Sequence, residues 1–152
     1  TACPIEANLQ KLLADSCKDA GADHHVGGSY ICIEGPQFSS KAESNIYRSF
    51  GATVIGMTNV PEAFLAKEAG MVYATVAMVT DYDCWKAEHC TVEEIMKVMN
   101  SNYISVQKMV EGLIPDLVKN PVDVKPENKF AVVTNPDLIS AEQKKINKVL
   151  ID

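Results

Sequence analysis

The sequence has no run of about 18 apolar residues and no leader-like amino terminus, so it predicts neither a membrane span nor secretion. Arginine occurs once, at Arg48, and the net charge is −6, which argues against a nucleic-acid-binding surface. The five cysteines are odd in number, widely spaced and without a CxxC pair. That pattern favours reduced thiols in a cytoplasmic protein over a disulfide framework or a zinc site.

What is present is ordinary for a globular domain. The 152 residues are 47% hydrophobic and 22% charged, which is enough chain and enough apolar surface for one domain with a core. The sequence begins at Thr1, close to a predicted helix start, and we expect it to be a piece of a longer protein.

Helical and strand patterns alternate along the chain. Apolar residues at helical spacing predict helices over residues 1–22, 40–51, 62–69, 91–115 and 140–150. Pro4 suits the first turn of the first helix, and Pro115 is expected to end or kink the fourth. Short apolar runs predict strands over residues 25–33, 52–57 and 71–80, with Gly27-Gly28 marking a bulge or a close backbone approach. The alternation predicts an α/β domain with a mixed, largely parallel sheet flanked by helices.

Residues 71–80 form the central strand of this prediction. They carry no charge, which is typical of a strand that is buried on both faces of a parallel sheet. Asp81, Tyr82 and Asp83 follow immediately. Ligands of open α/β sheets bind just beyond the carboxyl ends of the strands, so these carboxylates are candidate site residues.

Polar clusters follow all three predicted strands, at residues 34–39, 57–59 and 80–83. In a parallel sheet these strand ends lie along one edge. Together the clusters offer carboxylates, hydroxyls, a methionine and a phenylalanine, which suit a flat aromatic ligand with amino and hydroxyl groups. The alternative for each cluster alone is ordinary turn chemistry.

Three ordered segments carry a family resemblance: GPQFSSKAES at 35–44, GMTNVPEAFLAKEAG at 56–70 and AMVTDYDCW at 77–85. They resemble the second half of the trimeric purine nucleoside phosphorylases and, within that family, the 5′-methylthioadenosine phosphorylases. The resemblance covers residues 1–115. It implies that residues 1–152 are the carboxyl-terminal portion of a single phosphorylase domain.

The resemblance also implies a reaction, in which phosphate attacks C1′ of methylthioadenosine and releases adenine and 5-methylthioribose 1-phosphate. Inorganic phosphate is the co-substrate, and no metal or organic cofactor is implied. Negative charge builds on the departing purine, so a protonated Asp81 would donate to its N7, and Asp83 would accept from the 6-amino group. The alternative is a solvated pair of loop carboxylates.

Further roles come from the same resemblance. Asp81 together with Ser39 favours adenine over 6-oxopurines, and Thr80 steers the carboxylates. Phe38 would pack on the base, Met57 would lie against the ribose, and Thr58 would bind phosphate. The alternatives are core packing for Phe38 and Met57 and a helix cap for Thr58. The apolar wall for the 5′-methylthio group would be formed by Val92, Ile95 and Met96, although ordinary core packing explains these residues equally well. His89 is expected at the surface, and a place at the 5′ side of the nucleoside is the alternative.

This chain lacks the residues that the family's first half contributes, including the phosphate-binding arginine, and Arg48 is expected to be structural. We therefore expect methylthioadenosine and phosphate as ligands, the missing amino-terminal half as a second chain, and a homotrimeric assembly. A purine nucleoside phosphorylase acting on inosine or guanosine, a non-catalytic structural fragment and an unrelated α/β binding module are the alternatives.

Overall fold

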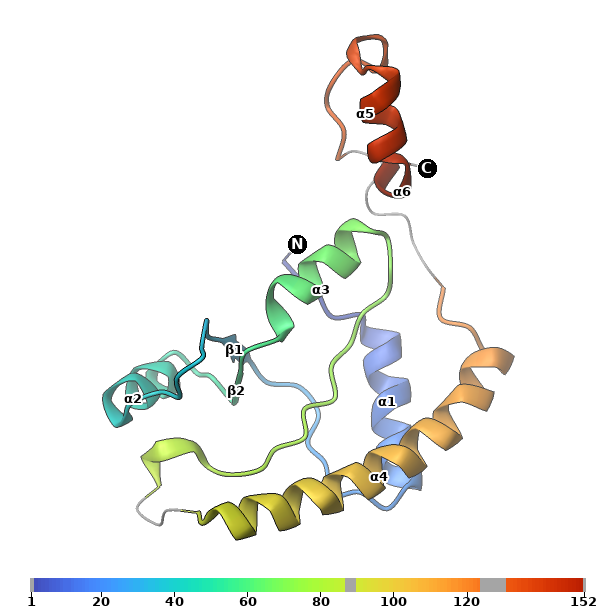
Figure 1. Cartoon of the computed structure of the whole chain (residues 1–152). Helices are drawn as coiled ribbons and strands as arrows, with labels where there is room; N and C mark the ends of the chain where they lie inside the picture. Colours follow the sequence, from blue (N-terminus) through green and yellow to red (C-terminus); the bar gives the residue numbers. More distant parts are fainter. Residues whose placement is uncertain (1, 87–89, 124–130, 152) are drawn as a thin grey trace.

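The computed structural model describes residues 2–86, 90–123 and 131–151 (Figure 1). Its elements follow in the order α1 (Ala7–Asp19), β1 (Tyr30–Cys32), α2 (Lys41–Ser49), β2 (Val54–Gly56), α3 (Asn59–Glu68), η1 (Asp83–Trp85), α4 (Val92–Lys119), η3 (Pro136–Leu138), α5 (Ala141–Ile146) and α6 (Lys148–Ile151). The two strands pair in parallel, and helices follow each of them. This confirms the predicted α/β class.

The parallel pair depends on a glycine. Tyr30 pairs with Val54 and Cys32 with Gly56. Just before β1, Gly28 has φ +105°, and a Cβ there would lie 2.7 Å from Thr53 Oγ1. The chains can approach this closely only because glycine has no side chain, as the Gly-Gly pair predicted.

The helices α2 and α4 begin where the sequence predicts. Ser40 accepts from the backbone N–H of Glu43, whose carboxylate accepts from Ser40 N–H, and Thr91 and Glu94 repeat this capping box at α4. Each box satisfies N–H groups that a helix start leaves without partners. The start of α2 is therefore fixed directly after Ser39.

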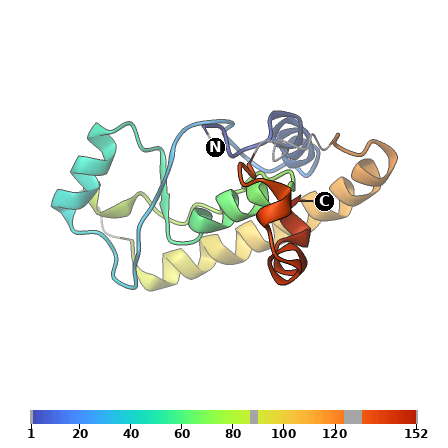
Figure 2. The same cartoon turned by 90° about the horizontal axis from the view of Figure 1, so that it is seen from above.

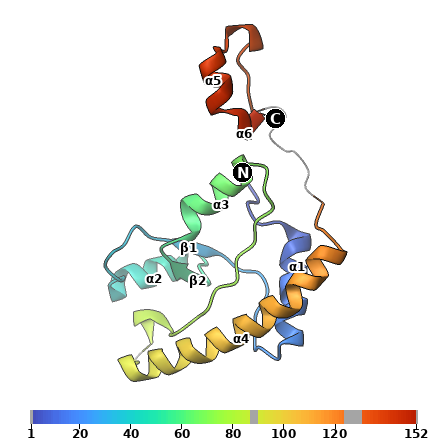
Figure 3. The same ribbon diagram turned by 45° about the vertical axis from the view of Figure 1, so that its right-hand side comes forward.

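A small core joins α1 to α4, which cross in the view of Figure 3 and lie in separate layers when seen from above in Figure 2. Cys17, Met109 and Leu113 are buried there. The Cys17 thiol donates to Met109 Sδ at 3.3 Å, and burial raises the pKa of this thiol. The two residues are 92 positions apart in sequence, so their contact joins the two ends of the segment that carries the strand-end clusters.

The prediction of a central strand over residues 71–80 is wrong for this chain. The segment crosses the molecule without a strand neighbour, and within the described residues no backbone N–H from 72 to 80 donates a hydrogen bond. Its anchors are Glu6 N–H donating to Tyr73 O and the Asn102 amide donating to Val79 O. Val76, Met78 and Val79 are exposed rather than buried.

Smaller corrections concern the ends of helices. The first helix begins at Ala7, with Glu6 as its N-cap, so Pro4 precedes it. Pro115 does not end α4, which continues to Lys119, and the last predicted helix is divided into α5 and α6. A proline costs a helix one backbone hydrogen bond, which the packing of the long α4 against α1 offsets.

Much apolar surface stays uncovered. The buried hydrophobic side chains of the described residues are Cys17, Ala63, Ala66, Met109 and Leu113, few for a chain of this length. The helices α5 and α6 stand apart from the other elements in Figures 1 and 3. No described helix combines the length and the hydropathy that crossing a membrane requires.

Candidate active site

A line of hydrogen bonds links the two candidate carboxylates. Thr80 donates its hydroxyl to Asp81 Oδ2 at 2.9 Å, and Asp83 donates its backbone N–H to Asp81 Oδ1 at 2.8 Å. Ser44, on α2, donates its hydroxyl to Asp83 Oδ2. These bonds hold both carboxylates in a defined relation, and the Thr80 hydroxyl bonds directly to Asp81, whereas its role in steering the carboxylates stays a prediction.

Cys84, the residue after the third polar cluster, contacts Ser39 of the first cluster. The Cys84 thiol donates to the Ser39 carbonyl at 3.3 Å. Ser39 Oγ is buried and has no hydrogen-bond partner among the described residues. A buried hydroxyl without a partner is costly, and most buried polar groups in native structures have one.

The second cluster reaches the first through Met57. Gly35 has φ +70°, and a Cβ at this position would lie 2.7 Å from Met57 Sδ. The methionine side chain therefore lies against the backbone that leads into Phe38 and Ser39. The predicted convergence holds for the first and second clusters, whereas the third follows an unpaired segment and adjoins the first through its neighbour Cys84.

Aromatic and cationic side chains hold η1 against α2. The Arg48 guanidinium lies 3.9 Å from the centroid of the Trp85 ring, and Tyr82 meets Trp85 edge to face at 6.0 Å. Cation–π contacts of this kind favour arginine over lysine. Arg48 therefore has the structural role predicted for it, and η1 carries Asp83 as its first residue.

Other candidate residues are not enclosed by this chain. Asp81 and Thr58 are exposed, Phe38 is 87% exposed, and Val92 and Met96 at the start of α4 are exposed, with Ile95 half-buried between them. Thr58 occupies the N-cap position of α3 without a capping hydrogen bond from its side chain. The predicted shelter for Asp81 is thus not formed by the described residues, and His89 lies outside them.

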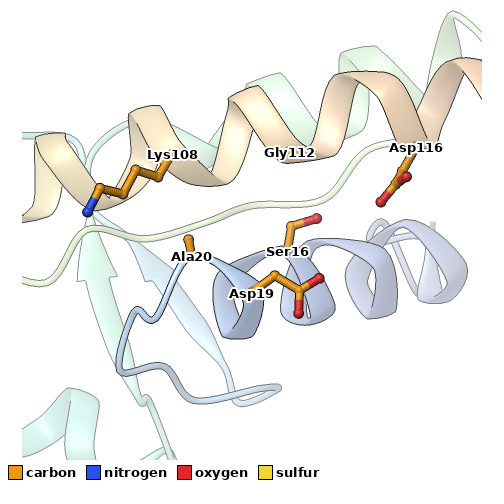
Figure 4. Close-up of a pocket in the computed structure, with 6 residues that line it drawn as sticks. All are labelled: Ser16, Asp19, Ala20, Lys108, Gly112 and Asp116. Carbon is orange, nitrogen blue, oxygen red and sulfur yellow. The ribbon is translucent and has the colours of Figure 1, made fainter.

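A hollow of about 360 Å³ lies elsewhere, between α1 and α4 (Figure 4). It is lined by Ser16, Asp19, Ala20, Lys108, Gly112 and Asp116. None of these belongs to the strand-end clusters. Among the described residues, no three His, Cys, Asp or Glu side chains gather closely enough to hold a metal ion.

A family model described as the phosphorylase superfamily matches residues 1–115. The chain belongs to this superfamily. It is 42% identical to S-methyl-5′-thioadenosine phosphorylase of Koribacter versatilis over 97% of this chain and 52% of that protein. With the protein of the same name from Thermofilum pendens, it shares 46% identity over 75% of this chain and 44% of the relative.

Two solved structures resemble this chain in fold as well as in sequence. A methylthioadenosine phosphorylase from an antarctic soil metagenomic library superposes with a TM-score of 0.91 and 33% identity, over 99% of this chain and 55% of that chain. A double mutant of adenosine/methylthioadenosine phosphorylase from Schistosoma mansoni, in complex with adenine, gives a TM-score of 0.70 and 29% identity, over 77% of this chain and 48% of that one. The chain spans about half the length of the relatives that it matches.

Sequence reasoning missed the contact of Ser44 with Asp83. Ser44 follows the capping residue Ser40 by four positions, so the sequence alone marks it as a helix residue. The side chain of Ser44 is only 1% exposed, which is unusual for a serine inside a helix, and this burial is the signal that singles it out.

Proposed function

We propose that this chain forms the base, ribose and methylthio side of an enzyme that cleaves 5′-methylthioadenosine with phosphate. The products are adenine and 5-methylthioribose 1-phosphate, so the enzyme is a pentosyltransferase of purine and methionine salvage. The observation that carries this proposal is the 42% identity, over nearly the whole chain, to a relative named S-methyl-5′-thioadenosine phosphorylase.

On the base side, Asp81 donates to the purine N7 and Asp83 accepts from the 6-amino group. The hydrogen bonds from Thr80 and from the Asp83 backbone fix the Asp81 carboxylate, and the bond from Ser44 fixes that of Asp83, which supports this assignment. The donor role requires that Asp81 be sheltered from water in the assembled enzyme, since only an enclosed carboxyl keeps its proton at neutral pH. The unpartnered Ser39 hydroxyl supplies a further polar contact for the base.

The remaining contacts follow along the nucleoside. Phe38 packs on the base, and Met57, beside Gly35, lies against the ribose. Thr58 binds phosphate from the segment that leads into α3, where its hydroxyl is not used as a cap. The methylthio group meets an apolar wall formed by Val92, Ile95 and Met96.

The partner of this chain is the amino-terminal half of the same enzyme, supplied as a second polypeptide. Residues 72–80 support this, because their backbone N–H groups lack partners within the described residues and their side chains Val76, Met78 and Val79 are exposed. A backbone segment whose N–H groups lack partners is a template for the addition of a strand from another chain. Strands from the partner would complete the sheet here and cover Asp81.

Three further features belong to the proposal. The assembled enzyme is a homotrimer, uses inorganic phosphate without a metal or organic cofactor, and works in the cytoplasm. The free thiols of Cys3, Cys17, Cys32, Cys84 and Cys90 support a reducing compartment.

The test is reconstitution. The chain is produced alone and together with the amino-terminal half of the Geobacter sulfurreducens relative. This relative is 41% identical to the chain over 145 aligned residues. We expect phosphate-dependent release of adenine from methylthioadenosine by the complex and none by the chain alone, and a complex that is a trimer by light scattering. Denaturing gels and intact masses identify the species present.

Two results would contradict the proposal. Full activity in a preparation that contains only the 16.6 kDa chain would exclude the need for a second polypeptide. Faster phosphorolysis of inosine than of methylthioadenosine would assign the site to 6-oxopurine nucleosides instead.

Replacing Val76 by Lys should weaken the association of this chain with the amino-terminal half, because Val76 lies within residues 72–80. The matched replacement of exposed Val133, which lies outside this segment, should leave the association unchanged.

A further inference from the structure

We infer that Ser44 is a positioning residue that fixes the orientation of Asp83 and thereby sets the preference for a 6-aminopurine. This inference rests on the proposed function. Ser44 is 1% exposed, and its hydroxyl donates to Asp83 Oδ2 across 39 positions of sequence. Ser44 therefore faces a carboxylate of the candidate site and does not lie on the exposed surface of its helix.

Three features restrict Asp83: its backbone conformation, the hydrogen bond of its N–H and the hydrogen bond that its carboxylate accepts from Ser44. Its backbone has φ +57°, in the left-handed region that aspartate tolerates better than most residues. Its N–H is bonded to Asp81 Oδ1 at 2.8 Å. These two features fix the direction of the side chain but leave the carboxylate free to rotate, and the bond from Ser44 removes that freedom.

The geometry leaves one Asp83 oxygen for a ligand. Ser44 takes Oδ2, and within the described residues no hydrogen bond reaches Oδ1. A carboxylate oxygen accepts from an amino group but repels a carbonyl oxygen, so its fixed orientation discriminates a 6-amino from a 6-oxo substituent. A freely rotating carboxylate would discriminate less.

The helix that carries Ser44 also sets the position of Ser39. The capping box of Ser40 and Glu43 begins α2 directly after Ser39, and Cys84 donates to the Ser39 carbonyl at 3.3 Å. One helix therefore places the buried Ser39 hydroxyl and orients Asp83. The two groups that would read the purine edge share a single rigid support.

The experiment uses the reconstituted complex with Ser44→Ala, and compares kcat/KM for methylthioadenosine with kcat/KM for 5′-methylthioinosine, its 6-oxo analogue. We expect the ratio to fall by about tenfold, the size of effect that losing a hydrogen bond to a charged group produces. Ser44→Cys, which keeps a weak donor, should lose less. Circular dichroism verifies that the helices are retained.

Ser49→Ala is the matched control. Ser49 lies on the same helix, is exposed, and donates to its own helix at Ile46 O, 2.7 Å away. It should leave the ratio unchanged. The double variant Ser44→Ala with Asp83→Ala should be no less selective than Asp83→Ala alone, because Ser44 acts through Asp83.

Each outcome decides between distinct claims. An active wild-type complex whose selectivity is unaffected by Ser44→Ala overturns this inference and leaves the proposed function standing. Equal losses on both substrates also overturn it, because they indicate a general structural role. A well-assembled wild-type complex without phosphorolysis overturns the proposed function, and this inference with it.

Discussion

Asp81→Asn is the change that probes the proposed chemistry most directly. It replaces one carboxylate oxygen by an amide NH₂ at almost constant volume. Asp81 Oδ1 accepts from Asp83 N–H at 2.8 Å, and Oδ2 accepts from the Thr80 hydroxyl at 2.9 Å. An asparagine keeps its oxygen toward Asp83 and turns its NH₂ toward Thr80, whose hydroxyl can also accept.

The structural cost of this change is therefore small. Both hydrogen bonds have a substitute, and Asp81 is exposed in this chain, so no buried group loses its partner. We expect the free energy of unfolding to change by less than about 1 kcal/mol. A loss of activity can then be attributed to chemistry rather than to unfolding.

The catalytic cost is larger. An amide can donate a hydrogen bond to the purine but cannot transfer a proton to it, and general acid catalysis contributes about 10²–10⁴-fold. We expect kcat/KM for methylthioadenosine to fall by about 100-fold, which corresponds to about 2.7 kcal/mol. The loss for 5′-methylthioinosine should be much smaller, because the amide can donate to its 6-oxo group, so preference moves toward 6-oxopurines.

The assay measures both substrates on the reconstituted complex, with thermal unfolding as the check on folding. Asp116→Asn is the matched control, since Asp116 lines the hollow between α1 and α4 and lies outside the strand-end clusters. An Asp81→Asn complex with unchanged kcat/KM and unchanged base preference would refute the role of Asp81 as the proton donor.

Two further predictions concern the scaffold. Met109→Ala should lower the free energy of unfolding by about 2 kcal/mol in urea titrations, because it leaves a cavity beside Cys17, whereas Val110→Ala, at a 37% exposed position, should cost less. Hydrogen bonds from the Ser40 side chain and backbone lower the pKa of Glu43 from 4.5, so its contribution to stability is present above pH 4.5 and is lost as the pH falls. Glu43→Gln should keep the cap and reduce this acid sensitivity, as followed by circular dichroism, and an unchanged pH profile would contradict the assignment.

Local features of the fold could be predicted from the sequence. The capping boxes at Ser40, Thr91 and Ser140 all lie at helix starts, because their partners are three residues away. The Gly27-Gly28 approach to the second strand was predicted for the same kind of reason, since only glycine permits the contact with Thr53. Pro115 does not end α4, because the packing of this helix against α1 outweighs a single lost helical hydrogen bond.

Features that need distant partners were predicted less well. The apolar pattern of residues 71–80 indicates a buried strand, yet strand pairing and burial require neighbours that the described residues do not supply. The same reason leaves Asp81 and Phe38 exposed. The pattern describes the environment for which the segment is suited, whereas the structure describes what this chain alone provides.

The sequence by itself determined the helix starts, the parallel α/β order and the ordered segments that assign the chain to the phosphorylase superfamily. These follow from interactions between near neighbours and from residue identity. Only the tertiary structure decided that Ser44 reaches Asp83, that Cys84 meets Ser39 and that residues 71–80 remain unpaired. Contacts between residues about 40 positions apart depend on how helices and loops pack in space, and no local pattern encodes that distance.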